Sequence, residues 1–203
     1  MELRDAVSQI AQIHQQMSRD DVFRGYRSTT IAITGATGFL AATFQSNWVP
    51  DPATNVAQYL GLWLSVAIVN LVVVGVSLTY RSQFIDSGLA RQHTWLAIKQ
   101  FAPCVVVGGV LTLCIFYTAR HVAWMLPGLW ALIFSLGVFA SNRLLPQQVL
   151  WIGSYYAASG IFCLIYGQGE HAHSPWLMGG SFGGGQILTA AILYWTLERN
   201  DGQ

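Results

Sequence analysis

The sequence predicts an all-α, polytopic membrane bundle of six transmembrane helices, preceded by an amphipathic cytoplasmic helix. Charged residues are 9% of the 203 residues and hydrophobic residues are 53%, whereas a soluble domain usually has about 25% charged residues. The apolar residues also fall into uncharged blocks of roughly 17 to 25, which is long enough to cross a hydrocarbon core of about 30 Å. We therefore expect the lipid bilayer as a partner. The formal net charge of +1 provides no basic face, so we expect no nucleic-acid partner.

Residues 1–27 are predicted to form the amphipathic cytoplasmic helix, and residues 28–203 the transmembrane domain. Apolar positions recur at alternating steps of four and three, which places them on one stripe of a helix. Such a helix can lie on the membrane surface, pack on the cytoplasmic side of the bundle or pair with a partner helix. The stripe consists of Leu3, Val7, Ile10, His14 and Met17.

Six spans are expected at residues 28–46, 56–80, 100–118, 122–140, 147–167 and 175–196. The connections between them are short, except for residues 81–99. With the N-terminus inside, nine of the ten Lys and Arg residues are cytoplasmic and only Arg120 is outside, as the positive-inside rule requires. This distribution predicts a bacterial-type inner membrane protein with both termini in the cytoplasm.

Aromatic residues agree with this orientation, because Trp and Tyr favour the two interfaces of a membrane. The expected outer belt contains Trp48, Tyr59, Tyr117, Trp124, Tyr166 and Trp176, and the inner belt contains Tyr26, Tyr80, Trp95, Trp151, Tyr194 and Trp195.

The first span contains TGATGFLA at residues 34–41, which resembles the TGxxGFxG cofactor loop of extended short-chain dehydrogenases. Ala41 replaces the last glycine, no alternation of strands and helices follows, and the chain contains no YxxxK pair. The context that the cofactor loop requires is therefore absent. As part of a membrane helix, Gly35 and Gly38 with Thr34 and Thr37 are expected to form a small, weakly polar packing face.

A metal site is one alternative for the loop before the sixth span. His171 and His173 lie beside Glu170, and His121 in the other charged outer loop could approach them. Imidazole and carboxylate suit Zn, Cu or Ni, and paired histidines could instead hold haem. Six-helix membrane cytochromes place their histidines inside the helices, however, whereas these lie in loops or at helix edges. The favoured expectation is that the chain carries no cofactor.

The spans contain no Asp, Glu, Lys, Arg or His in their central parts, which argues against proton-coupled transport and intramembrane hydrolysis. Two amides remain, Asn70 in the second span and Gln186 in the sixth. Amides in lipid are costly unless they are hydrogen-bonded, so both should face the bundle. Tyr155 and Tyr156 in the fifth span could complete a polar path.

The sixth span carries the densest group of small residues. At about 100° per residue, one face holds Gly179, Gly183, Gln186 and Ala190, and the adjoining strip holds Gly180, Gly184 and Ala191. Two overlapping GxxxG spacings favour close helix packing. The alternative is a locally loosened helix whose carbonyls line a cavity.

These observations favour a small integral membrane protein without enzymatic activity. We expect it to associate with itself, as a homo-oligomer, or with another membrane protein, through the glycine-rich sixth helix. One alternative is a channel or facilitator for a small neutral solute, lined by Asn70 and Gln186. The other is an outer-face metal or haem protein.

Overall fold

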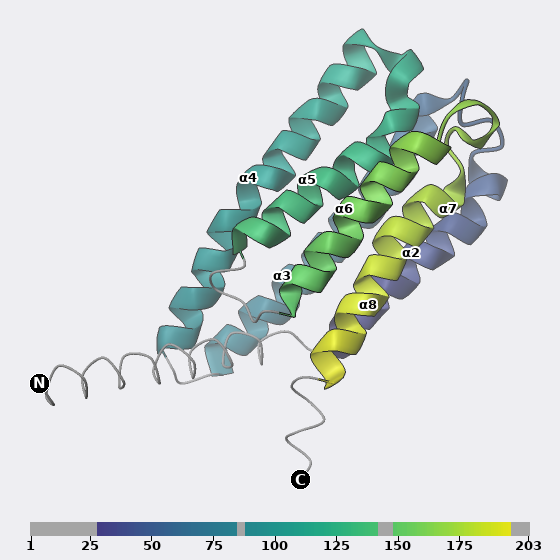
Figure 1. Cartoon of the computed structure of the whole chain (residues 1–203). Coiled ribbons are helices and arrows are strands. Elements are labelled where there is room, and N and C mark those ends of the chain that lie inside the picture. The colour runs from purple at the N-terminus through teal and green to yellow at the C-terminus, as the bar shows by residue number, and fades with distance from the viewer. Residues whose placement is uncertain (1–27, 85–87, 142–147, 196–203) are drawn as a thin grey trace, which may run out of the picture.

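The computed structural model describes residues 28–84, 88–141 and 148–195 (Figure 1). The side chains of residues 81–94 and 97 are outside this description, as is the predicted N-terminal helix of residues 1–27. All regular secondary structure within the described ranges is helical. The predicted all-α class is therefore confirmed.

The helices follow one another along the chain and lie roughly side by side (Figure 1). They are α2 (Ser28–Trp48), α3 (Val56–Phe84), α4 (Gly88–Thr118), the 3₁₀ helix η1 (Arg120–Met125), α5 (Leu126–Ala140), α6 (Val149–Tyr166), the 3₁₀ helix η3 (Gly169–His171), α7 (Pro175–Met178), the π-helical segment η4 (Gly179–Gly183) and α8 (Gly184–Leu193). We call the end at which α2 leads to α3, α4 to η1 and α6 to η3 the η3 end.

Four stretches among the described residues are long and apolar enough to cross a membrane. They are Val56–Tyr80, Ile98–Thr118, Arg120–Ala140 and Val149–Tyr166, and they match the second to fifth predicted spans. The chain is therefore a helical membrane protein. The first and sixth predicted spans are also helical where they are described, as α2 and as α7, η4 and α8, but they are not among these four.

The connection expected at residues 81–99 matches the stretch between the spans Val56–Tyr80 and Ile98–Thr118, but its described residues are helical. Helix α3 continues to Phe84, and α4 begins at Gly88 and runs through Pro103. The apolar block ends where charged residues begin, but helix propagation does not depend on hydrophobicity. Arg, Leu, Ala, Gln and Lys, which make up nine of the 19 residues in this stretch, are all good helix formers.

Helix α2 packs closely against the last helical stretch through glycines. A Cβ atom at Gly38 would lie 3.2 Å from the Gly183 Cα, and one at Gly183 would lie 3.2 Å from the Gly35 carbonyl oxygen. A Cβ at Gly179 would lie 2.7 Å from that of Ala42. The backbones meet because these side chains are missing or very small, which is the packing that small residues allow between membrane helices.

The adjoining face of α2 is joined to α3 by polar side chains. Thr37 Oγ1 donates a hydrogen bond to Asn70 Oδ1 at 2.8 Å, and the Asn70 amide donates to the Thr34 carbonyl at 3.4 Å. The hydroxyls of Thr30 and Ser77 lie 3.4 Å apart. Helix α2 is therefore the element that connects α3 to α8.

Helices α5 and α6 form the second closely packed pair. A Cβ at Gly128 would lie 2.8 Å from the Gly160 carbonyl oxygen, and one at Gly160 would lie 2.9 Å from that of Gly128. Helix α4 is held to α5 by Trp130, whose Nε1 donates to Thr112 Oγ1 at 2.9 Å. Figure 1 shows α4 at one edge of the bundle and α8 near the other.

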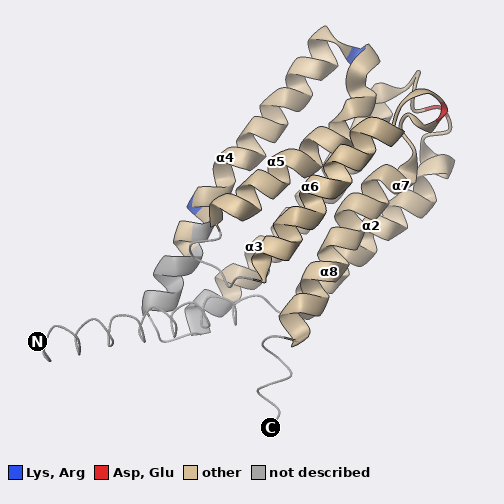
Figure 2. Cartoon of the chain, viewed as in Figure 1, with Lys and Arg blue, Asp and Glu red and all other residues tan. Residues whose placement is uncertain are grey.

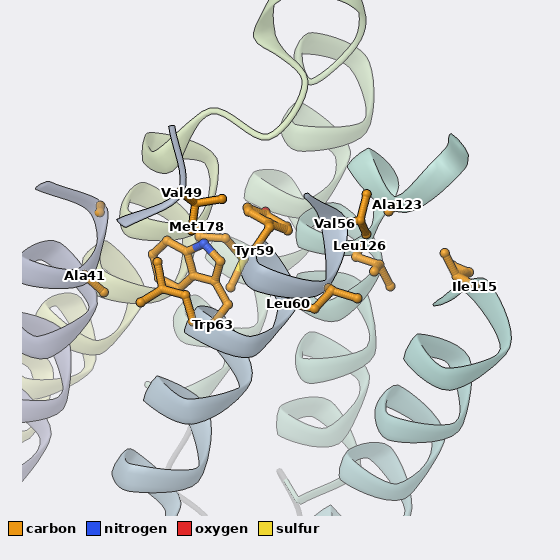
Figure 3. Packing of buried hydrophobic residues seen from close by; sticks show 12 residues of the cluster. Ala41, Val49, Val56, Tyr59, Leu60, Trp63, Ile115, Ala123, Leu126 and Met178 are labelled. Carbon is orange, nitrogen blue, oxygen red and sulfur yellow. The ribbon is translucent and has the colours of Figure 1, made fainter. Parts of the chain in front are cut away.

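The larger buried apolar cluster lies at the η3 end, where α3 meets α5 and α7 (Figure 3). Tyr59, Ala123 and Leu126 are completely buried in it. A second cluster includes Ile31, Tyr156 and Leu193 and connects α2, α6 and α8. Together they hold the α2 to α8 unit against the α5 to α6 pair.

Figure 2 shows no charged residue along α2, α5, α6, α7 or α8. The exposed aromatic side chains include Trp48, Tyr117, Tyr166 and Trp176 of the expected outer belt and Tyr80, Trp95, Trp151, Tyr194 and Trp195 of the inner belt. Tyr59 differs from the expectation because it is fully buried. It faces the bundle from the first turn of α3 and does not contribute to an interfacial belt.

Candidate functional site

A buried polar junction joins three segments at the η3 end. Gln45, near the end of α2, is 2% exposed. Its Oε1 accepts a hydrogen bond from Trp63 Nε1 of α3 at 2.8 Å. Its Nε2 donates to the His173 carbonyl oxygen at 2.9 Å. One amide thus connects α2 to α3 and to the loop before α7, and we call this group, with Tyr59, the Gln45 junction.

The loop places its two histidines in different surroundings. His171 is exposed and stacks on the Tyr166 ring, with centroids 4.2 Å apart and an interplanar angle of 11°. His173 has a φ of 62°, which is unusual for a residue with a side chain, and its ring is 6% exposed. The HxH sequence therefore directs one imidazole outward and the other inward.

Tyr59 and His173 meet inside the junction. Their ring centroids lie 5.0 Å apart, and the rings are edge to face at 81°. Figure 3 shows Tyr59 and Trp63 near the start of α3, close to Met178. Tyr59 Oη and both ring nitrogens of His173 are buried without a hydrogen-bond partner among the described residues.

Burial also determines the ionisation of the His173 ring. Desolvation holds the pKa of the His173 imidazole below its ordinary value, because a charged form would lose its hydration. The two described carboxylates at this end, Asp51 and Glu170, are both exposed. His173 is therefore a neutral donor and acceptor at physiological pH.

The four candidate metal ligands are not gathered into one group. His121, Glu170 and His171 are exposed, whereas His173 is buried against Tyr59. No three His, Cys, Asp or Glu side chains in the described part of the chain lie close enough together to hold a metal ion.

The four residues of the expected polar path have different partners. Asn70 is bonded to α2, and Tyr155 Oη donates to the Gly180 carbonyl at 2.6 Å. Tyr156 is buried, and its hydroxyl is unpartnered in the described structure while its ring contacts phenylalanines of α5 and η4. Gln186 is half-buried and has no hydrogen bond within the described ranges. Hydrogen bonds therefore do not join these four side chains into one path.

The small residues of the sixth span lie mainly against neighbours in the same chain. Gly179 and Gly183 contact α2, and a Cβ at Gly184 would meet the Tyr155 hydroxyl at 2.5 Å, whereas a Cβ at Gly180 would meet nothing within 4 Å. Residues Gly179–Gly183 form a π-helical turn, and its Gly180 carbonyl accepts the Tyr155 bond. Further along α8, Ala190 is buried and Ala191 half-buried.

The sequence reasoning missed Gln45, Trp63 and the role of Tyr59. Gln45 lies one residue before the end of the first predicted span, where an amide can reach polar headgroups without a protein partner. Once buried, a glutamine side chain requires partners for both its donor and its acceptor. Its partners come from a tryptophan 18 residues later and a carbonyl 128 residues later, and no local pattern identifies them.

No protein-family model matches this sequence, and no curated protein and no solved structure matches it either. The fold and the junction by themselves define a class, which is a helical membrane protein with a buried polar junction at one end.

Proposed function

We propose that the chain is a non-enzymatic integral membrane protein that associates with itself or with another membrane protein. In this proposal all six predicted spans cross a bacterial-type inner membrane, and both termini are cytoplasmic. The observation that carries the proposal is the low internal burial of two helices. Only 17% of the most apolar stretch of α3 and 11% of that of α4 are buried within the chain, against 44% for Arg120–Ala140.

Three glycines on these two helices support association. The chain uses glycines where its own helices meet, as at Gly128 and Gly160. A Cβ at Gly61 or Gly75 of α3, or at Gly109 of α4, would meet nothing within 4 Å. An interior glycine costs a helix about 1 kcal/mol relative to alanine, and small residues are enriched where membrane helices pack together.

The α3 glycines face away from the bundle. Asn70, which is bonded to α2, follows Gly61 by nine residues, and at about 100° per residue these two positions lie on opposite faces of α3. Gly75 follows Gly61 by fourteen residues, close to four turns, so both glycines lie on the same face. This placement moves the proposed contact surface from the sixth span, in which Gly179 and Gly183 contact α2, to α3.

The test is the native mass of the protein extracted with its surrounding lipid. We expect Gly61→Leu and Gly75→Leu to reduce the assembly to single chains that remain folded, because a Cβ at either glycine would meet nothing in its own chain within 4 Å. Ala158→Leu adds similar bulk at an exposed position of α6 and is the matched control. Unchanged masses in both glycine variants would contradict the proposal.

The two alternative functions receive no comparable support. Asn70 is occupied by its bonds to α2, and the candidate metal ligands are separated. Neither a solute path nor a metal centre is therefore favoured by a specific contact among the described residues.

A further inference from the structure

We propose that the Gln45 junction binds one small neutral molecule, of the size of water, that hydrogen-bonds to Tyr59 Oη and to a ring nitrogen of His173. The inference does not depend on the proposed association. It starts from three polar atoms that are buried without a partner in the described structure and that belong to two rings in edge-to-face contact. Buried polar groups in proteins nearly always have a hydrogen-bond partner.

Neither ring is free to turn toward bulk water. Tyr59 is 0% exposed and is packed among apolar side chains from α3, α5 and α7. The backbone of His173 is held by the Gln45 amide at 2.9 Å and has the left-handed conformation that directs its ring inward. A partner must therefore come to these atoms, because they cannot reach one outside.

The surroundings determine which kind of molecule fits. The polar side chains of the junction beside the two rings are the neutral Gln45 amide and the Trp63 indole. Asp51 and Glu170 are exposed, so no described charge is placed to balance a buried ion. A neutral imidazole and a phenol can each donate one hydrogen bond and accept another. The bound molecule is therefore neutral, both donor and acceptor, and small.

The sign of one stability change tests the proposal. If the Tyr59 hydroxyl has no partner, Tyr59→Phe removes a buried unsatisfied group and raises the apparent Tm. If the hydroxyl bonds to a bound molecule, the same change lowers the Tm by about 2–4 °C, the shift that follows from one lost hydrogen bond in a chain of this size. We expect the lower Tm.

Two other tyrosines calibrate this measurement. Tyr155→Phe removes a hydroxyl that donates to Gly180 and should lower the Tm. Tyr156→Phe removes a hydroxyl that is also unpartnered, but its ring contacts Phe134, Phe182 and Tyr155 and has no second unpartnered polar group beside it. No molecule is therefore expected there, and the Tm should rise or stay unchanged. A Tyr59→Phe protein that behaves like Tyr156→Phe would overturn the proposal.

A second arm tests whether one molecule bridges the two rings. In a His173→Phe background, Tyr59→Phe should no longer lower the Tm, because the bridge has already lost one end. An undiminished effect would count against a shared molecule. If the variants fail to fold, NMR of the unaltered protein with labelled histidine decides the question. A cross-peak between a His173 ring N–H and water supports the site, and a ring N–H that shows no bonded partner overturns it.

Discussion

Replacing Gln45 with leucine tests the contact that holds the η3 end together. The change keeps a side chain of similar size but removes the acceptor of Trp63 Nε1 and the donor to the His173 carbonyl. Each hydrogen bond contributes about 1 kcal/mol net. We therefore expect a loss of about 2 kcal/mol, which corresponds to a fall in Tm of about 4–8 °C for a chain of this size.

The assay is thermal unfolding in one detergent, followed by intrinsic tryptophan fluorescence, since Trp63 is 2% exposed and loses its partner directly. Gln186→Leu is the matched control, because it makes the same change at a half-buried glutamine without a hydrogen bond in the described structure. Its Tm should shift by less than about 2 °C. Equal shifts in the two variants would refute the assignment of Gln45 as the connecting residue.

Three further predictions concern α2 and the buried histidine. Gly179→Ala should destabilise the protein by about 1–3 kcal/mol, because the new Cβ would lie 2.7 Å from the Cβ of an alanine in α2. Gly180→Ala should be neutral or stabilising, because its new Cβ would meet nothing within 4 Å. Equal unfolding temperatures for the two variants would contradict the close contact between Gly179 and α2. The apparent Tm should fall as the pH drops below about 6.5, because the His173 imidazole of the unfolded chain takes up a proton before that of the folded chain. The free energy of unfolding should decrease by up to ~1.4 kcal/mol per pH unit until the lowered pKa of His173 is reached. A His173→Phe protein whose Tm declines just as steeply with pH would refute this origin. Asn70→Leu should lower the Tm by about 2–4 °C because Thr37 loses its partner on α3, and an unchanged Tm would show that this bond does not hold α3 to α2.

The helical class was predictable because hydrophobic blocks and the near absence of charge are properties of the sequence alone. The end of a helix was predictable only where the apolar block stops at the same residue as the helix, as at Thr118 and Ala140. The helical structure of the described residues between Arg81 and Lys99 was not predicted, because charged residues that leave the membrane can still continue a helix.

The partners of individual side chains were less predictable. Spacing alone identified Gly179 and Gly183 as small residues on one face, but it could not show that the neighbour is α2 of the same chain. Asn70 was expected to face the bundle, yet its partner Thr37 is 33 residues away in sequence. The inward position of His173 depends on a backbone φ of 62°, which no residue pattern in this loop requires.

The central claim is that the exposed faces of α3 and α4 are covered by another protein chain in the membrane. The most direct measurement is the mass of the protein extracted from its native membrane with surrounding lipid, compared with the mass of one chain, which is 22.3 kDa for these 203 residues. We expect a whole multiple of this mass, or one chain together with a second membrane protein in fixed proportion. A mass of one chain with lipid alone would contradict it.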